Sequence, residues 1–186
     1  MIYAFDGRKP KIREGVYIND HAIVIGDVEI GDGCYVGAGV ILRGDYGRIE
    51  IGAETAVEEG VVVHAPPERT CRIGEKVTIG HGAIIHSSNI DRLAVIEMGA
   101  VLSLGAKIGE SAIVAEGAVV TFKQNVSAGV VVGGNPAKVL REVTTKDKEF
   151  WEKGKRIYIN LAKKCLEIGF QSIDETRGLH GLEREL

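Results

Sequence analysis

The side chains best suited to chemistry in this sequence are its histidines. There are five of them: His21, His64, His81, His86 and His180. Neutral imidazole is a preferred ligand of zinc and related divalent metals, so a group of histidines held close together can form a metal site. A lone histidine is more often a surface residue or a hydrogen-bonded core residue, and we interpret His21 and His180 in that way. The other three need a framework that fixes their relative positions.

That framework is a six-residue repeat of aliphatic anchors. They stand at Ile12, Ile18, Val24, Ile30, Val36 and Leu42, then at Ile51, Val57, Val63, Ile73, Ile79 and Ile85, and last at Ile90, Ile96, Leu102, Ile108, Val114, Val120, Val126 and Val132. A small residue often stands four positions after the anchor, as at Ala94 and Ala106, and glycine often follows it, as at Gly31 and Gly74. We interpret these glycines as permitting the backbone angles of a tight corner.

The repeat predicts an all-β fold, a parallel β-helix with a narrow aliphatic core. Three hexads make one triangular coil of about 18 residues, and stacked coils pair as parallel strands about 4.8 Å apart. A β-sandwich with short strands is the alternative, but it does not keep six-residue spacing across about 120 residues. We therefore expect the β-helix domain to cover residues 1–140.

The composition changes after the last hexad. Residues 145–170 read as a capped amphipathic α-helix, and residues 171–186 are polar, weakly patterned and expected to fray. The apolar stripe predicted for the helix consists of Phe150, Ile157, Leu161, Cys165 and Ile168. Such a helix can pack back along the prism or across a contact between subunits.

The repeat gives three histidines defined positions. His64 follows anchor Val63 and His86 follows anchor Ile85, so the two are separated by one coil and four further residues. Those four loop out within residues 65–72, which places both imidazoles at the same hexad position on adjacent coils, about 5 Å apart. His81 lies on the preceding facet, and a neighbouring copy could bring it to the same ion. The histidines therefore predict a metal site between subunits of a homotrimer; a hydrogen-bonded seam without metal is the alternative.

The stretch Ile79-Gly80-His81-Gly82-Ala83-Ile84-Ile85-His86, with His64 upstream, resembles the metal motif of the gamma-class carbonic anhydrases. The resemblance covers nearly the whole repeat region and implies a left-handed helix. Arg43 and Asp45 are similar to that family's Arg-x-Asp pair. The turn at residues 133–138 is shared with hexapeptide acyltransferases, and residues 151–158 resemble accessory proteins of phenylacetate and carnitine metabolism.

This resemblance implies reversible hydration of CO2 to bicarbonate by hydroxide on a metal held by His64, His81 and His86. Three imidazoles suit Zn²⁺, and Fe²⁺ or Co²⁺ is possible. It also implies that Arg43 and Asp45 position the substrate and hold the subunit contact; a plain interface ion pair is the alternative. The family's Gln and Asp before the first histidine are replaced by Glu58 and Glu59. An ionised glutamate only accepts hydrogen bonds, and its charge disfavours hydroxide, so we expect weak activity.

Three other functions fit the same residues. One is a metal-dependent acyl-coenzyme A thioesterase assisted by Glu58, which the resemblance to accessory proteins suggests. Another is a hexapeptide acyltransferase that uses a histidine as general base and needs no metal. The last is a non-catalytic assembly subunit in which the metal clamps the subunits together.

Bulk composition narrows the partners. The net charge of −3 gives no reason to expect nucleic acid or an anionic membrane. The three cysteines form neither a CxxC pair nor an even framework, so a disulfide scaffold is not expected. No secretory leader or membrane-spanning run is evident, and a cytoplasmic location is the expectation.

Overall fold

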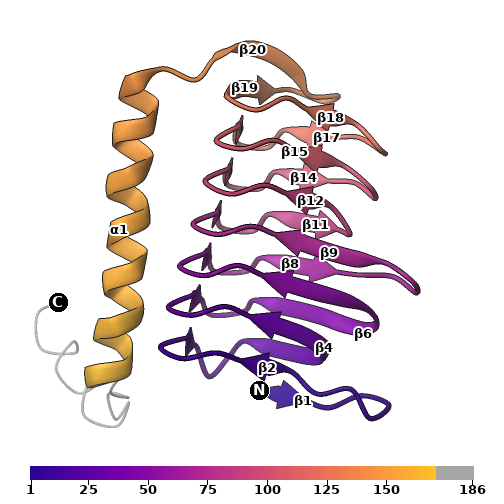
Figure 1. The fold of residues 1–186 in the computed structure, drawn as a ribbon, viewed down its shortest axis with the longest axis vertical. Helices are drawn as coiled ribbons and strands as arrows, with labels where there is room; N and C mark the ends of the chain where they lie inside the picture. The colour runs from indigo at the N-terminus through magenta and orange to yellow at the C-terminus, as the bar shows by residue number, and fades with distance from the viewer. Residues whose placement is uncertain (171–186) are drawn as a thin grey trace, which may run out of the picture.

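The computed structural model describes residues 1–170, and the tail predicted over 171–186 lies outside this part. The described residues form a left-handed parallel β-helix, a stack of triangular coils, followed by one long helix beside the stack (Figure 1). The strands of the first face are β1 (Ile2–Tyr3), the first halves of β4 (Ile23–Ile30) and β6 (Ile41–Ile51), β8 (Val62–His64), β11 (Ile84–His86), β14 (Val101–Leu102) and β17 (Val119–Val120).

The strands of the other two faces follow the same order. The second face holds β2 (Lys11–Ile12), the second halves of β4 and β6, β9 (Thr70–Ile73), β12 (Asn89–Ile90), β15 (Lys107–Ile108) and β18 (Asn125–Val126). The third face holds β3 (Tyr17–Ile18), β5 (Tyr35–Val36), β7 (Ala56–Val57), β10 (Thr78–Ile79), β13 (Val95–Ile96), β16 (Ile113–Val114) and β19 (Val130–Gly133). After β19 the chain turns back into β20 (Lys138–Glu142), which pairs antiparallel with it.

The register confirms the predicted coil. Asn89 pairs with Lys107 on the second face, and Val95 pairs with Ile113 on the third, so partners differ by one coil of three hexads. The aliphatic anchors point inward and are buried, as are the small corner residues such as Ala94 and Ala106. Ile12 is exposed and Ile18 is half-buried, because both lie in the first coils, near the open end of the prism.

The glycines that follow the anchors are required for a different reason from the one predicted. Gly31, Gly74 and Gly109 do not have left-handed backbone angles. A Cβ atom at these positions would lie 2.6, 2.6 and 2.4 Å from backbone atoms of the next coil, so the close stacking of coils is what excludes a side chain. The left-handed corner positions come later in the hexad, for example at Gly33 and Gly82.

The outward-facing residues differ strongly among the three faces. The first face displays a column of aliphatic residues in register: Ile23, Ile41, Val62, Ile84, Val101 and Val119. The second face displays a polar column: Lys11, Glu29, Glu50, Arg72, Asn89, Lys107 and Asn125. On the third face the corresponding column runs from Tyr17 to Val131 and lies under the helix. The first face is therefore apolar and has no covering element among residues 1–170.

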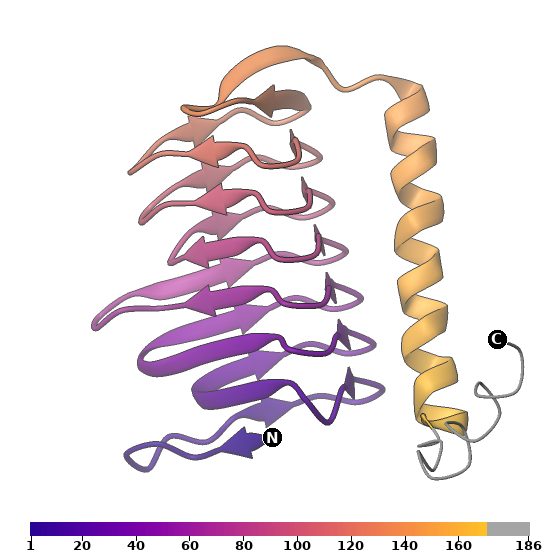
Figure 2. The same cartoon turned by 180° about the vertical axis from the view of Figure 1, so that it is seen from behind.

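Helix α1 (Thr145–Ile168) runs back along the prism from its last coil to its first (Figures 1 and 2). Thr144 caps it, because its side chain accepts from the Asp147 backbone N–H while the Asp147 carboxylate accepts from the Thr144 N–H. No helix within residues 1–170 has the length and apolar character needed to cross a bilayer.

The helix packs through only part of the predicted apolar stripe, since Leu161 and Cys165 contact the prism. Phe150, Ile157 and Ile168 are 66%, 64% and 64% exposed, so this part of the prediction was wrong. The face turned to the prism carries Trp151, Lys155, Tyr158 and Ala162 together with the predicted Cys165. The C-terminal half of the helix packs on Tyr17 and Tyr35 of the third face through Tyr158, Leu161, Ala162 and Cys165.

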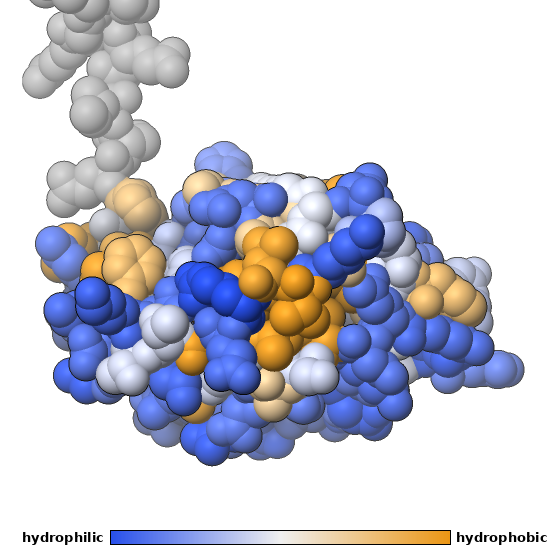
Figure 3. All heavy atoms as spheres, turned by 90° about the horizontal axis from the view of Figure 1, so that it is seen from above, coloured by the Kyte–Doolittle hydropathy of each residue, from blue (hydrophilic) through white to orange (hydrophobic). Residues whose placement is uncertain are grey.

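The last coil is closed by β20. Viewed from this end, apolar side chains gather at the centre of the surface (Figure 3). β20 contributes Val139 and Leu140 to the exposed apolar residues, and both are more than 60% exposed (64% and 63%).

Candidate metal site

The first two predicted ligands lie side by side. His64 ends β8 and His86 ends β11, and the two residues pair directly between adjacent coils. Their rings are stacked with centroids 5.2 Å apart and an angle of 15° between planes. The prediction that four residues loop out between them, which places both imidazoles at one hexad position, is therefore confirmed.

Arg43 and Asp45 lie beside this pair. Arg43 occupies the same column one coil earlier and pairs with His64 along the strands. Its Nη1 donates to Asp45 Oδ2 at 2.9 Å, and Asp45 Oδ1 lies 3.7 Å from His64 Nε2. Burial works to raise the pKa of Asp45, but the Tyr46 backbone N–H and the Arg43 guanidinium outweigh it and hold that pKa below its ordinary value. The carboxylate is thus ionised beside the histidine.

The same surroundings keep His64 neutral. Burial lowers the pKa of His64, and the nearby Arg43 and His86 lower it further, against the opposing effect of Asp45. A neutral imidazole is the form that binds a metal.

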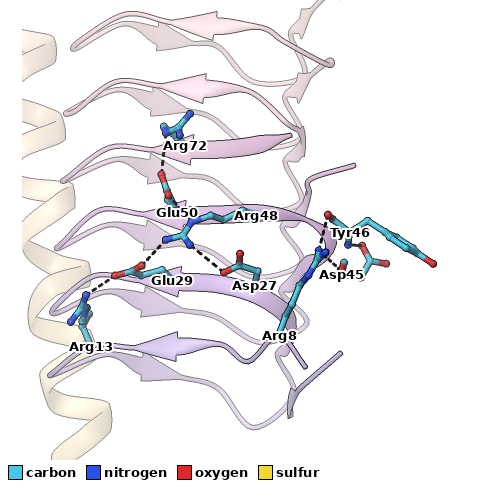
Figure 4. Close-up of polar contacts among 9 residues, drawn as sticks. All are labelled: Arg8, Arg13, Asp27, Glu29, Asp45, Tyr46, Arg48, Glu50 and Arg72. Atoms are coloured by element: carbon cyan, nitrogen blue, oxygen red, sulfur yellow. Dashed lines mark hydrogen bonds and ion pairs between the residues drawn. The ribbon is translucent and has the colours of Figure 1, made fainter. Parts of the chain in front are cut away.

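Arg8 from the N-terminal segment fixes the backbone at Asp45, because its Nη1 donates to the carbonyls of Asp45 and Tyr46 at 3.0 and 2.8 Å (Figure 4).

His81 lies away from these residues in its own chain. It stands in the corner between β10 and β11, whereas His86 ends β11, so the two lie at opposite ends of one strand of the first face. Its Nδ1 is 2.9 Å from Glu59 Oε2 and its Nε2 is 3.1 Å from Glu58 Oε2. Tyr35 donates from its hydroxyl to Glu59 Oε1 at 2.7 Å. Glu58 and Glu59 therefore accompany His81, and not the pair formed by His64 and His86.

Glu58 is almost fully buried. Burial raises its pKa, and the charge of His81 acts in the opposite direction. Helix α1 completes its surroundings, since Tyr158 hydrogen-bonds to the Glu58 carboxylate and Lys155 lies close enough to interact with its charge. These two helix residues and Tyr35 were not predicted as part of the site. Tyr158 belongs to the segment 151–158, whose resemblance to accessory proteins was noted in the sequence, whereas no sequence signal pointed to Tyr35 or Lys155.

The side chains present are suitable metal donors, but one chain does not bring them together around a single ion. Within residues 1–170, no three histidine, cysteine or carboxylate side chains converge on a common point where an ion could sit. Two features of the histidines suit metal ligands. His64 is kept neutral, and the Glu59 carboxylate on the Nδ1 of His81 is the contact that commonly orients a ligating imidazole. The Nε2 of His81 lies 3.1 Å from Glu58 Oε2, so a metal bound there would take the place of this contact. His21 has an exposed side chain and lies apart from this group.

A ladder of ion pairs crosses the second face next to the site (Figure 4). Arg48 bridges Glu29 at 2.9 Å and Glu50 at 2.6 Å, and the ladder continues to Arg13 and Arg72 at 2.7 and 3.0 Å. Exposed pairs such as these contribute little stability one by one. Their effect is to keep the second face polar, in contrast to the aliphatic first face.

The fold and the histidine arrangement define a hexapeptide-repeat β-helix protein, and comparisons with known proteins agree. The model "Bacterial transferase hexapeptide (six repeats)" matches residues 9–44. The chain is 38% identical to the carnitine operon protein CaiE of Proteus sp. (strain LE138), over 88% of this chain and 83% of that protein. It is 34% identical to mitochondrial gamma carbonic anhydrase 2 of Arabidopsis thaliana over 88% of this chain, and spans only 60% of that relative's length.

A solved structure shows the same architecture. The crystal structure of a hexapeptide transferase family protein from Anaplasma phagocytophilum superposes with a TM-score of 0.84 at 32% identity, over 88% of this chain and 96% of that one. The chain belongs to the gamma-carbonic-anhydrase-like hexapeptide-repeat family, in the group that contains the CaiE proteins. Its cytoplasmic location stays a prediction.

Proposed function

We propose that the chain forms a homotrimer in which His64 and His86 of one subunit and His81 of the next bind a divalent metal, and that this site hydrates CO2. The observation that carries the proposal is the position of these histidines. They stand at the two ends of the one face that displays an unbroken aliphatic column, and burial of that column between subunits is the main force for association. Zn²⁺ is the ion proposed, with Fe²⁺ or Co²⁺ as alternatives.

Each protein group has a defined part in this reaction. When bound, such a cation supplies a Lewis acid that makes a nucleophile available from water near neutral pH. Arg43, held by Asp45, keeps its guanidinium half-exposed and can pair with the bicarbonate anion. Glu59 and Tyr35 orient His81. Glu58 can accept a proton, but its negative charge repels bicarbonate, so hydration should be slow and Glu58→Gln should increase it.

Mixing two inactive variants tests the shared site. His81→Ala subunits keep the first two ligands, and His86→Ala subunits keep the third. After dissociation and reassembly of a 1:1 mixture, an intact site needs the first kind of subunit followed by the second, so about one quarter of the wild-type metal content should return. Each variant alone should bind none. Metal content is measured directly, and zero recovery from a mixture shown to contain mixed trimers would refute the shared site.

CO2 hydration is then measured by stopped-flow with the metal-loaded wild-type protein and with Glu58→Gln. Hydration no faster than buffer in both proteins would refute the hydratase proposal even if the metal site stands. The second candidate function is then hydrolysis of acyl-coenzyme A thioesters. The buried Glu58 carboxylate beside His81 favours it, because such a carboxylate can act as a general base. Release of the thiol from a panel of acyl-coenzyme A thioesters tests it.

A further inference from the structure

A cavity of about 430 Å³ lies between helix α1 and the third face of the prism, apart from the histidines. Lys76, Leu93 and Ser111 line one side of it. Each of these residues stands in the corner between the second and third faces, on successive coils. In a triangular prism this corner is opposite the first face, so an assembly through the aliphatic column leaves the cavity accessible.

The floor of the cavity is apolar. Val95 and Ile113 point outward from β13 and β16, and the Trp151 indole packs against them from the helix. Val143 adds to the same cluster. The volume falls within the range of small-molecule sites, roughly 300–1,000 Å³, which are commonly apolar with a few placed polar groups. The cavity can therefore enclose an aliphatic chain or a single ring.

The charges around this floor are predominantly positive. Both acidic residues that line the cavity have cationic partners, since Asp147 pairs with Arg141 at 2.6 Å and Glu152 pairs with Arg156. Lys148 and Lys155 also line it, and neither forms a direct ion pair with a carboxylate among residues 1–170, although Lys155 interacts with the charge of the buried Glu58. An anion in the cavity would meet two ammonium groups that are not neutralised by direct ion pairs.

Lys155 is the more informative of these lysines. It is only 7% exposed, and its Nζ donates to Thr78 Oγ1 at 3.1 Å and to the Ala94 carbonyl at 3.3 Å. The Ala94 carbonyl already accepts a hydrogen bond from the Thr78 backbone N–H, so this buried carbonyl is satisfied without Lys155. Two of the three ammonium donors are thus used by neutral acceptors, and the third can serve a ligand.

We propose that this cavity binds a monocarboxylate with an apolar chain or ring. The carboxylate accepts hydrogen bonds from Lys155 and Lys148, and the apolar part lies against Val95, Ile113 and Trp151. A neutral apolar molecule would leave the buried ammonium unpaired, and a small hydrophilic anion would leave the apolar floor uncovered. The cavity adjoins the surroundings of His81, because Lys155 interacts with the charge of Glu58. None of the proposed metal ligands lines the cavity, so the proposal does not rest on the metal site.

Fluorescence offers a direct test, because Trp151 is the single tryptophan in the sequence. The full-length protein is titrated at about pH 6, where Lys155 is an ammonium because its pKa is about 7, with hexanoate, octanoate and decanoate below micelle-forming concentrations. We expect a saturable change in Trp151 emission, with octylamine and acetate at least about tenfold weaker than octanoate. Absence of a saturable change with all three carboxylates, or equal binding of octylamine and octanoate, would overturn the proposal.

Variants of cavity residues test whether the carboxylate binds in this cavity. Lys155→Met should weaken octanoate binding by about tenfold or more, whereas Lys153→Met, an exposed lysine on the same helix, should leave it unchanged. Val143→Phe narrows the cavity and should weaken binding without removing a charge. Circular dichroism verifies the fold of each variant, and Lys148→Met replaces any variant that fails to fold. Wild-type affinity in Lys155→Met or in Lys148→Met would show that its ammonium is not the carboxylate's partner.

Discussion

Replacing Lys155 with methionine should remove a pH dependence of stability that the wild-type protein carries. Burial lowers the pKa of Lys155 from its ordinary 10.5 to about 7, against a smaller opposing effect from Glu58. Between these two values the unfolded chain binds more protons than the folded one, so stability rises as the pH increases. Below about pH 7 both states are protonated, and the full cost of burying the ammonium is present.

The size of the effect follows from these two pKa values. The contribution of one such group grows as RT ln(1 + 10^(pH − 7)) while the pH stays well below 10.5. It is about 0.4 kcal/mol at pH 7 and about 2 kcal/mol at pH 8.5, a gain of about 1.6 kcal/mol. This rise in stability can be measured only up to about pH 9. Burial raises the pKa of Cys34 and Cys71 from 9.0 to about 12, so above pH 9 these thiols ionise in the unfolded chain but not in the folded one, and stability falls.

Urea denaturation at several pH values between about 7 and 8.5 measures this slope. Wild type and Lys155→Met are compared at one protein concentration, since unfolding of an oligomer depends on concentration. Other titrating groups are largely common to both proteins and cancel in the difference. Lys153→Met is the control and should keep the wild-type slope. Parallel curves for wild type and Lys155→Met would refute the assignment of a charge-destabilised buried amine.

Further predictions concern the assembly, the core and the ligand support. Ile84→Lys places a charge in the aliphatic column and should convert the proposed trimer to folded monomers that lack metal, seen by light scattering, whereas Asn89→Lys on the second face should not. Leu102→Ala removes a fully buried anchor and should lower the free energy of unfolding by about 3 kcal/mol in urea titrations. Tyr35→Phe removes the hydroxyl that holds Glu59 and should weaken metal binding by about 10- to 100-fold in chelator competition.

The repeat was sufficient to predict the fold because each hexad contains the same anchor and corner positions, which determine locally which residue is buried and where the chain turns. An anchor such as Leu102 is buried in its coil for the same reason as Val120 in the next, so one correct interpretation extends along the chain. The same regularity placed His64 beside His86 after the inserted loop was subtracted. Spacing alone was enough for this pair because both residues belong to the periodic part.

The helix could not be placed in the same way. Hydrophobicity alone favours Phe150 and Ile157 as its buried residues, yet both are exposed, and the buried face includes Lys155. What selects that face is the surface it meets: tyrosines of the third face below, β-branched residues above and the Glu58 carboxylate between them. These partners are distant in sequence and follow no common period with the helix. The cavity was missed for the same reason.

The path of helix α1 has a consequence for how the protein is made. In an ordinary repeat stack each unit touches only its neighbours, and coils can become stable one after another as they leave the ribosome. Here the end of the helix reaches the first coils, where Tyr17 packs near Phe170 with ring centroids 6.2 Å apart. The coils synthesised first therefore receive their covering from residues synthesised much later. Until then their tyrosines remain open to solvent and to chaperones during translation.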